Sequence, residues 1–156
     1  MENRIRTSIP ENIASEVLLK IKEAGDLIAP YITPLSVDER RALPKMGDGT
    51  SPFVKKCLEY SQANPKFVPA YLNVDDFKSD MDTWERLLGM LRPVQQLYQN
   101  LNDTTLEAGS ESYTAALSVY NAVKDAAKRG VADSKPIYDD LKERFAKSKR
   151  KSPNAG

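Results

Sequence analysis

Apolar residues recur at steps of three and four through most of this chain, and no other feature constrains its fold as strongly. Such steps follow the 3.6-residue turn of an α-helix, so each run places its apolar side chains on one face. The first run comprises Ile13, Val17, Ile21, Ala24 and Ile28. It predicts a helix over residues 10–29 with Ser8 as its cap and a wide core-facing stripe.

Caps, prolines and glycines divide the next stretch into shorter elements. Ser36 and Glu39 have the spacing of a capping box and predict a short helix over residues 37–43. The glycines at 47 and 49 indicate a plain turn, with phosphate or calcium contact as the weaker alternative. A further helix is expected over residues 51–63. Its predicted inner face comprises Phe53, Val54, Cys57, Leu58 and Ser61.

A third main helix is predicted from Asn73, a good capping residue, to about Leu101. Its stripe comprises Phe77, Met81, Trp84, Leu88 and Leu91. Pro93 lies inside this pattern, and proline removes one backbone hydrogen bond from a helix interior. Because the apolar stripe resumes beyond it, the pattern indicates a kink or two abutting helices.

The predicted fourth helix begins after Asp103 and ends at Arg129, with Gly130 in the left-handed position that often follows a helix. A break at Gly109 is the alternative. A last short helix is expected over residues 134–146, with Ser134 as its cap and Ile137, Leu141 and Phe145 spaced by fours.

These elements predict an all-α fold. We expect an up-and-down bundle of about four main helices, with a short additional helix and a Pro-kinked third helix. The 156 residues suit one domain. We expect a flexible N-terminus over residues 1–8, a single helical-bundle domain over residues 9–146 and a disordered basic tail over residues 147–156.

The chain has no histidine and a single cysteine, Cys57, which removes many of the side chains used in chemistry at neutral pH. Histidine is the only side chain whose unperturbed pKa lies near 7, and it is the commonest transition-metal ligand. Ser-His-Asp sites and His-ligated metal sites are therefore excluded. We expect a protein that is not an enzyme and has no catalytic residue, no metal site and no cofactor.

The carboxylates do not supply a replacement site. The densest acidic group comprises Asp75, Asp76, Asp80, Asp82 and Glu85. It is interpreted as a solvated helix face, with a hard cation as the alternative. Asp139 and Asp140 are adjacent on a predicted helix and point about 100° apart, so they do not converge on one substrate.

Seven tyrosines suggest a ligand site between helices. Tyr113 and Tyr120 share a seam two turns apart, and Tyr98 is expected to face them from the preceding helix. Together the three could line a small-molecule or lipid pocket. The favoured interpretation places them at the margins of the core with their hydroxyl groups in water.

The C-terminal tail offers a possible anion contact through Lys147, Lys149, Arg150 and Lys151. No aromatic residue interleaves with this basic run, so association with nucleic acid is the weaker interpretation of it. No stretch reaches the ~20 apolar residues of a membrane span, and the start has no apolar run of the signal-peptide kind. With only one cysteine, we expect a cytoplasmic protein.

Several segments of the second half also form a recognisable pattern. They read LRP at 91–93, AGSESYTAAL at 108–117 and IYDDLK at 137–142, with Tyr120, VK at 123–124 and AAK at 126–128 between the last two. Over about residues 30–145 the chain resembles a family of small bacterial helical-bundle proteins without an assigned activity. The resemblance implies a bacterial cytosolic bundle and no residue roles.

The abundance of helical surface favours a non-enzymatic protein-interaction or scaffold module, with a protein partner or self-association. Two alternatives stay open. One is a small-molecule or lipid-binding bundle that uses the tyrosines, and the other is weak nucleic-acid association through the tail.

Overall fold

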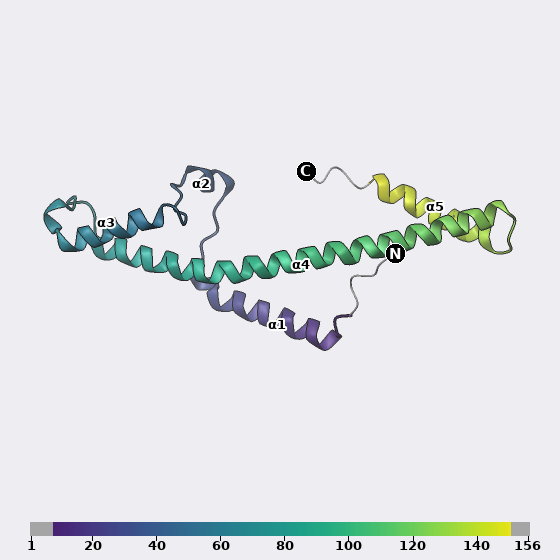
Figure 1. Cartoon of the computed structure of the whole chain (residues 1–156), viewed down its shortest axis with the longest axis horizontal. Coiled ribbons are helices and arrows are strands. Elements are labelled where there is room, and N and C mark those ends of the chain that lie inside the picture. The colour runs from purple at the N-terminus through teal and green to yellow at the C-terminus, as the bar shows by residue number, and fades with distance from the viewer. Residues whose placement is uncertain (1–7, 151–156) are drawn as a thin grey trace. The chain divides into compact units, whose positions relative to one another are not determined.

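The structure, a computed structural model, describes residues 8–150 and the side chains as far as residue 146. The prediction of an all-α fold is confirmed, since this part of the chain contains helices and no strand (Figure 1). Its α-helices are α1 (Glu11–Ile28), α2 (Val37–Ala42), α3 (Ser51–Ala63), α4 (Val74–Lys128) and α5 (Ser134–Arg150), with short 3₁₀ turns at Ala29–Tyr31 and Pro65–Phe67.

Residue contacts divide the chain into two units. One comprises Ser8–Tyr98, and the described part of the other begins at Gln99. Helix α4 packs against α3 in the first unit and against α5 in the second (Figure 1). A single domain over residues 9–146 stays a prediction, since contacts alone do not reveal whether the units unfold together.

Helix α4 is 55 residues long and joins the predicted third and fourth helices. The predicted boundary at Asp103 is therefore wrong, and the helix also continues through Pro93 and Gly109. Hydroxyl residues near the expected boundary explain the error. Thr104 looks like a capping residue, but its Oγ1 donates to the carbonyl of Asn100 at 2.8 Å, one turn earlier, and so leaves the helix intact.

Both ends of α4 carry the predicted local signals. Asn73 Oδ1 accepts hydrogen bonds from the backbone N–H groups of Asp75 and Asp76 at 2.9 and 3.3 Å. At the other end, Gly130 has a φ of +71°, and its N–H and that of Val131 bond to carbonyls in the last turn of the helix. This paired arrangement satisfies carbonyl groups that the helix end would otherwise expose.

Two predicted caps are wrong. Helix α1 begins after Pro10, whose carbonyl accepts the N–H of Ala14, and no side chain caps it, so Ser8 does not have that role. In α5, Ser134 is the first helical residue, and its hydroxyl donates to the Val131 carbonyl at 2.5 Å. This helix also continues to Arg150, four residues beyond its predicted end.

Burial in the first unit centres on the contact between α3 and α4. Met81 on α4 is 5% exposed, and Val54, Cys57 and Leu58 on α3 are half-buried. Phe53, predicted on the same inner face, is 68% exposed. At 100° per residue it lies about 90° around α3 from the centre of the buried face, which places it at the edge of the contact.

Candidate interaction surfaces

Helix α1 carries an uncovered apolar stripe. Ile13, Val17 and Ile21 are 40–48% exposed, and no residue of the helix is buried. The prediction that this stripe faces a core is therefore wrong for the described chain. The ion pair between Lys22 and Asp26, one turn apart, lies on the other side of the helix. The helix is amphipathic, and its apolar face is exposed.

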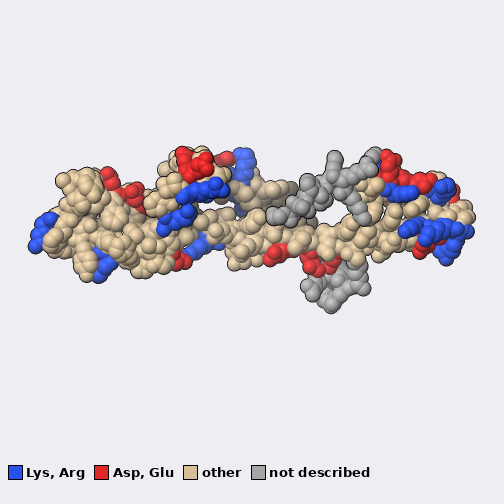
Figure 2. All heavy atoms as spheres, turned by 90° about the horizontal axis from the view of Figure 1, so that it is seen from above, with Lys and Arg blue, Asp and Glu red and all other residues tan. Residues whose placement is uncertain are grey.

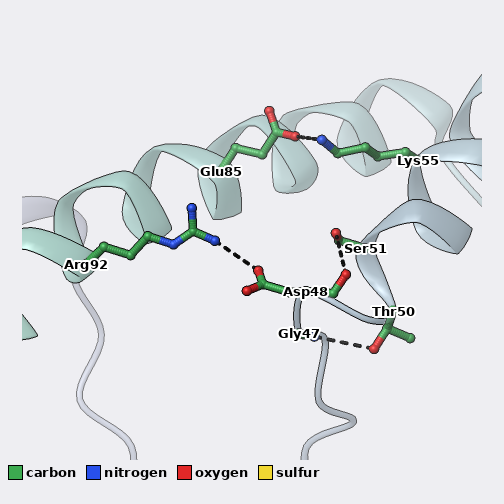
Figure 3. Close-up of polar contacts among 7 residues, drawn as sticks. All are labelled: Gly47, Asp48, Thr50, Ser51, Lys55, Glu85 and Arg92. Carbon is green, nitrogen blue, oxygen red and sulfur yellow. Dashed lines mark hydrogen bonds and ion pairs between the residues drawn. The ribbon is translucent and has the colours of Figure 1, made fainter.

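The Gly-Asp-Gly segment forms the expected turn and also contacts α4. The N–H of Ser51 and that of Thr50 both bond to the Gly47 carbonyl, which closes the turn. Asp48 extends from it to Arg92 on α4, with Oδ1 3.0 Å from the guanidinium (Figure 3). Exposed pairs of this kind contribute about 0–1 kcal/mol. They orient the turn more than they stabilise the fold.

The predicted acidic group is spread along the start of α4. Asp75 and Asp76 lie in its first turn, where they complement the positive end of the helix. Glu85 instead pairs with Lys55 of α3 at 2.5 Å (Figure 3). Across the described residues, no group of three or more His, Cys, Asp or Glu side chains is arranged to hold a metal ion.

The two adjacent aspartates of α5 have separate partners. Asp139 pairs with Lys135, and Asp140 accepts two bonds from Arg144 Nε at 3.0 and 2.9 Å. The hydrogen bond to Asp140 raises the pKa of Arg144 above its ordinary value. On the face seen in Figure 2, charged side chains likewise lie in small groups between uncharged stretches.

Helix α5 folds back along the end of α4 and forms an aromatic cluster with it. The Tyr120 ring stacks on Phe145 at 5.3 Å between centroids and lies 5.8 Å from the ring of Tyr138. Burial raises the pKa of the Tyr120 hydroxyl, and its hydrogen bond with Tyr138 raises it further. Ser134, 6% exposed, lies where the hairpin turns.

An apolar groove of about 430 Å³ lies along this hairpin. It is lined by Tyr113, Ala116, Leu117, Val119, Tyr120, Leu141, Arg144 and Phe145. Two of the three predicted pocket tyrosines are thus brought to one site. Tyr98 is not among the lining residues, because it precedes Tyr113 by fifteen residues on the same helix and does not face it from another.

The α5 contribution to this groove was not predicted. The spacing of Leu141 and Phe145 by fours was a usable signal, since it marks an apolar face on α5. Pairing that face with Tyr113 and Tyr120 required knowing that the chain reverses at residues 129–133. Helical periodicity gives the face but not its neighbour.

The predicted anion contact falls beyond the region whose side chains are described. Lys147, Lys149 and Arg150 belong to the last turns of α5, but their side chains, and all of Lys151, lie outside the described residues. Of the helices in the described range, none combines the length and the apolar character needed to cross a membrane.

No protein-family model, curated protein or solved structure matches this chain.

Proposed function

We propose that this chain is a non-enzymatic protein-interaction or scaffold module, which presents the apolar stripe of α1 to a hydrophobic groove on a partner. The exposure of that stripe is the observation that carries the proposal. Ile13, Val17 and Ile21 are 45%, 40% and 48% exposed. Contiguous exposed apolar surface of this kind marks interaction sites in soluble proteins.

The spacing of the stripe suits a helix-in-groove interaction. Such helices bind through anchors at steps of three, four and seven residues, as Val17, Ile21 and Ala24 are placed. Burying one Val, Leu or Ile side chain contributes about 1.5–3 kcal/mol. The Val and Ile side chains of the stripe number four, namely Ile13, Val17, Ile21 and Ile28. Their summed contribution is of the same order as the free-energy cost of lost translational and rotational freedom, about 4–15 kcal/mol, so we expect a moderate, reversible affinity.

Photocrosslinking tests this proposal. A photoreactive residue in place of Ile21 is expected to crosslink the full chain to a partner in a lysate, whereas the same residue at Lys22, on the charged side, is not. The captured protein is then purified and its binding measured against Ile21→Glu and the matched control Lys22→Glu. Equal binding by both variants, or no adduct at position 21, contradicts the proposal.

A small-molecule or lipid ligand in the hairpin groove is the second candidate. The groove has a volume of about 430 Å³, which lies within the range of ligand sites, ~300–1,000 Å³. Tyr113 and Tyr120 would give such a ligand two polar hydroxyl groups beside an apolar lining. A lipophilic dye displaced by palmitate, with binding lost in Val119→Glu, would support this candidate.

Two finer proposals rest on the sequence alone. A cytoplasmic location accords with the single cysteine, Cys57. Weak nucleic-acid association would use the basic run that begins at Lys147, and a salt-sensitive gel shift lost on deletion of residues 147–156 would support it.

A further inference from the structure

The α4–α5 hairpin leaves much of its apolar surface uncovered. Tyr120 and Phe145 are half-buried between the helices, but Tyr113 and Val119 at the groove are 56% and 58% exposed. Ile137, on the same stripe of α5 as Phe145, is 50% exposed. Two helices cannot enclose these side chains, and four can.

We infer that a second copy of this chain covers the groove, with the α4 segments of the two copies antiparallel and the two hairpins forming a four-helix bundle. This inference goes beyond the proposed function and concerns a surface separate from α1. Either can therefore fail without the other.

One face of α4 carries residues whose spacing is the same when read toward either end of the helix, and we call this row the α4 seam. Leu106, Tyr113, Tyr120 and Ala127 are seven residues apart, and their midpoint lies between Ala116 and Leu117. An antiparallel copy centred there sets Tyr113 opposite the Tyr120 position of the other chain, and Leu106 opposite Ala127. Both central residues line the groove. A two-fold axis at this point gives the self-complementary contact of a symmetric dimer.

Charge along the same stretch favours the antiparallel arrangement. Residues 103–111 contain three acids and no base, and residues 112–123 contain no charge. Residues 124–129 contain Lys124, Lys128 and Arg129 against a single acid, Asp125. Antiparallel pairing brings the acidic stretch of one copy beside the basic stretch of the other. Parallel pairing would set like charges together, which is unfavourable.

The available area meets the need of a stable dimer. Residues 106–127 of α4 span about 32 Å, and two adjacent helices are about 20 Å wide, so each copy offers on the order of 600 Å². Two copies would bury about 1,200 Å², the lower end of the range for specific interfaces. A small ligand would fill the groove but leave Leu106 and Ile137, 71% and 50% exposed, uncovered.

Sedimentation equilibrium of the full chain tests the inference. The wild-type chain is expected to show a monomer–dimer equilibrium, and Val119→Glu to be monomeric. The matched control is Ser118→Glu, which adds the same charge to an exposed position about 160° around α4 from Tyr120, outside the groove lining, and is expected to dimerise normally. Circular dichroism should show equal helicity for all three, which separates lost association from lost folding.

Cysteine crosslinking tests the orientation. In a Cys57→Ser background, Ala116→Cys lies near the proposed two-fold axis and is expected to form a disulfide-linked dimer on mild oxidation. Leu106→Cys, about 32 Å from its counterpart in an antiparallel pair, is not. Crosslinking at both positions indicates a parallel pair and overturns the arrangement.

Two further results overturn the inference. One is a wild-type chain that is monomeric at every concentration, whether or not it binds palmitate in the groove. The other is a dimer that Val119→Glu leaves intact. Crosslinking from position 21 of α1 would be unaffected by either result, so the proposed function is tested separately.

Discussion

Ser36 and Glu39 illustrate how far a local signal in this sequence determines local structure. The capping box predicted from their spacing is present, with Glu39 N donating to Ser36 Oγ at 3.2 Å and Ser36 N donating to Glu39 Oε2 at 2.8 Å. The bond from the Ser36 backbone, followed by that from its side chain, lowers the pKa of Glu39 below its ordinary value of 4.5. Because the two partners are only three residues apart, the sequence alone was enough to predict this capping box.

We predict that Ser36→Ala moves the pKa of Glu39 back toward its ordinary value. Since folding lowers this pKa, the stabilisation is present above pH 4.5 and is lost as the pH falls through the lowered value. Removing the cap should also destabilise α2, by about 1 kcal/mol. Carboxyl NMR titration measures the pKa, with Ser15→Ala on α1 as the control. The N–H of residue 36 can still donate to Glu39 in Ser36→Ala, so the return is expected to be partial. An unchanged Glu39 titration would show that the Ser36 side chain does not contribute to the lowered pKa.

At the scale of the element, the two ends of α4 were predicted correctly, whereas its continuity was not. Asn73 and Gly130 act through bonds to their own neighbours, and both were identified correctly. The expected break at Asp103 failed because a capping residue is also tolerated inside a helix when its hydroxyl bonds one turn back, as that of Thr104 does. The same short sequence permits both states, and only the surrounding helix decides between them.

Replacing glycine by alanine is expected to have opposite effects on stability at two positions, one inside α4 and one just after it. Gly130 has a φ of +71°, where a side chain is strained, so Gly130→Ala is expected to lower the free energy of unfolding by about 1–2 kcal/mol. Gly89 lies inside the helix, and a Cβ there meets nothing within 4 Å. Gly89→Ala is therefore expected to raise the stability by about 0.5–1 kcal/mol. Urea denaturation measures both, and the same sign for the two variants would contradict this account of the helix end.

At the scale of the whole molecule, the sequence supplied the helices but not their partners. The pairs Lys55–Glu85 and Asp48–Arg92, and the stacking of Tyr120 on Phe145, join residues 25 or more positions apart. Periodicity shows which face of a helix is apolar, and chain reversal and competition among several similar faces decide what that face meets. This limit explains the wrong expectation for α1. Its stripe has the same periodicity as that of a core-facing helix, but no other element among the described residues covers it.

The two units of contacts make the predicted single domain testable by hydrogen exchange. Met81 is the buried side chain of the α3–α4 contact, so Met81→Ala should destabilise that contact by about 2–5 kcal/mol and reduce protection in α3 and the first half of α4. Met90→Ala, at a 45% exposed position of the same helix, is the matched control. If the units open separately, protection in α5 remains unchanged. An equal loss of protection in α5 would instead show that α4 couples both units into one cooperative domain over residues 9–146.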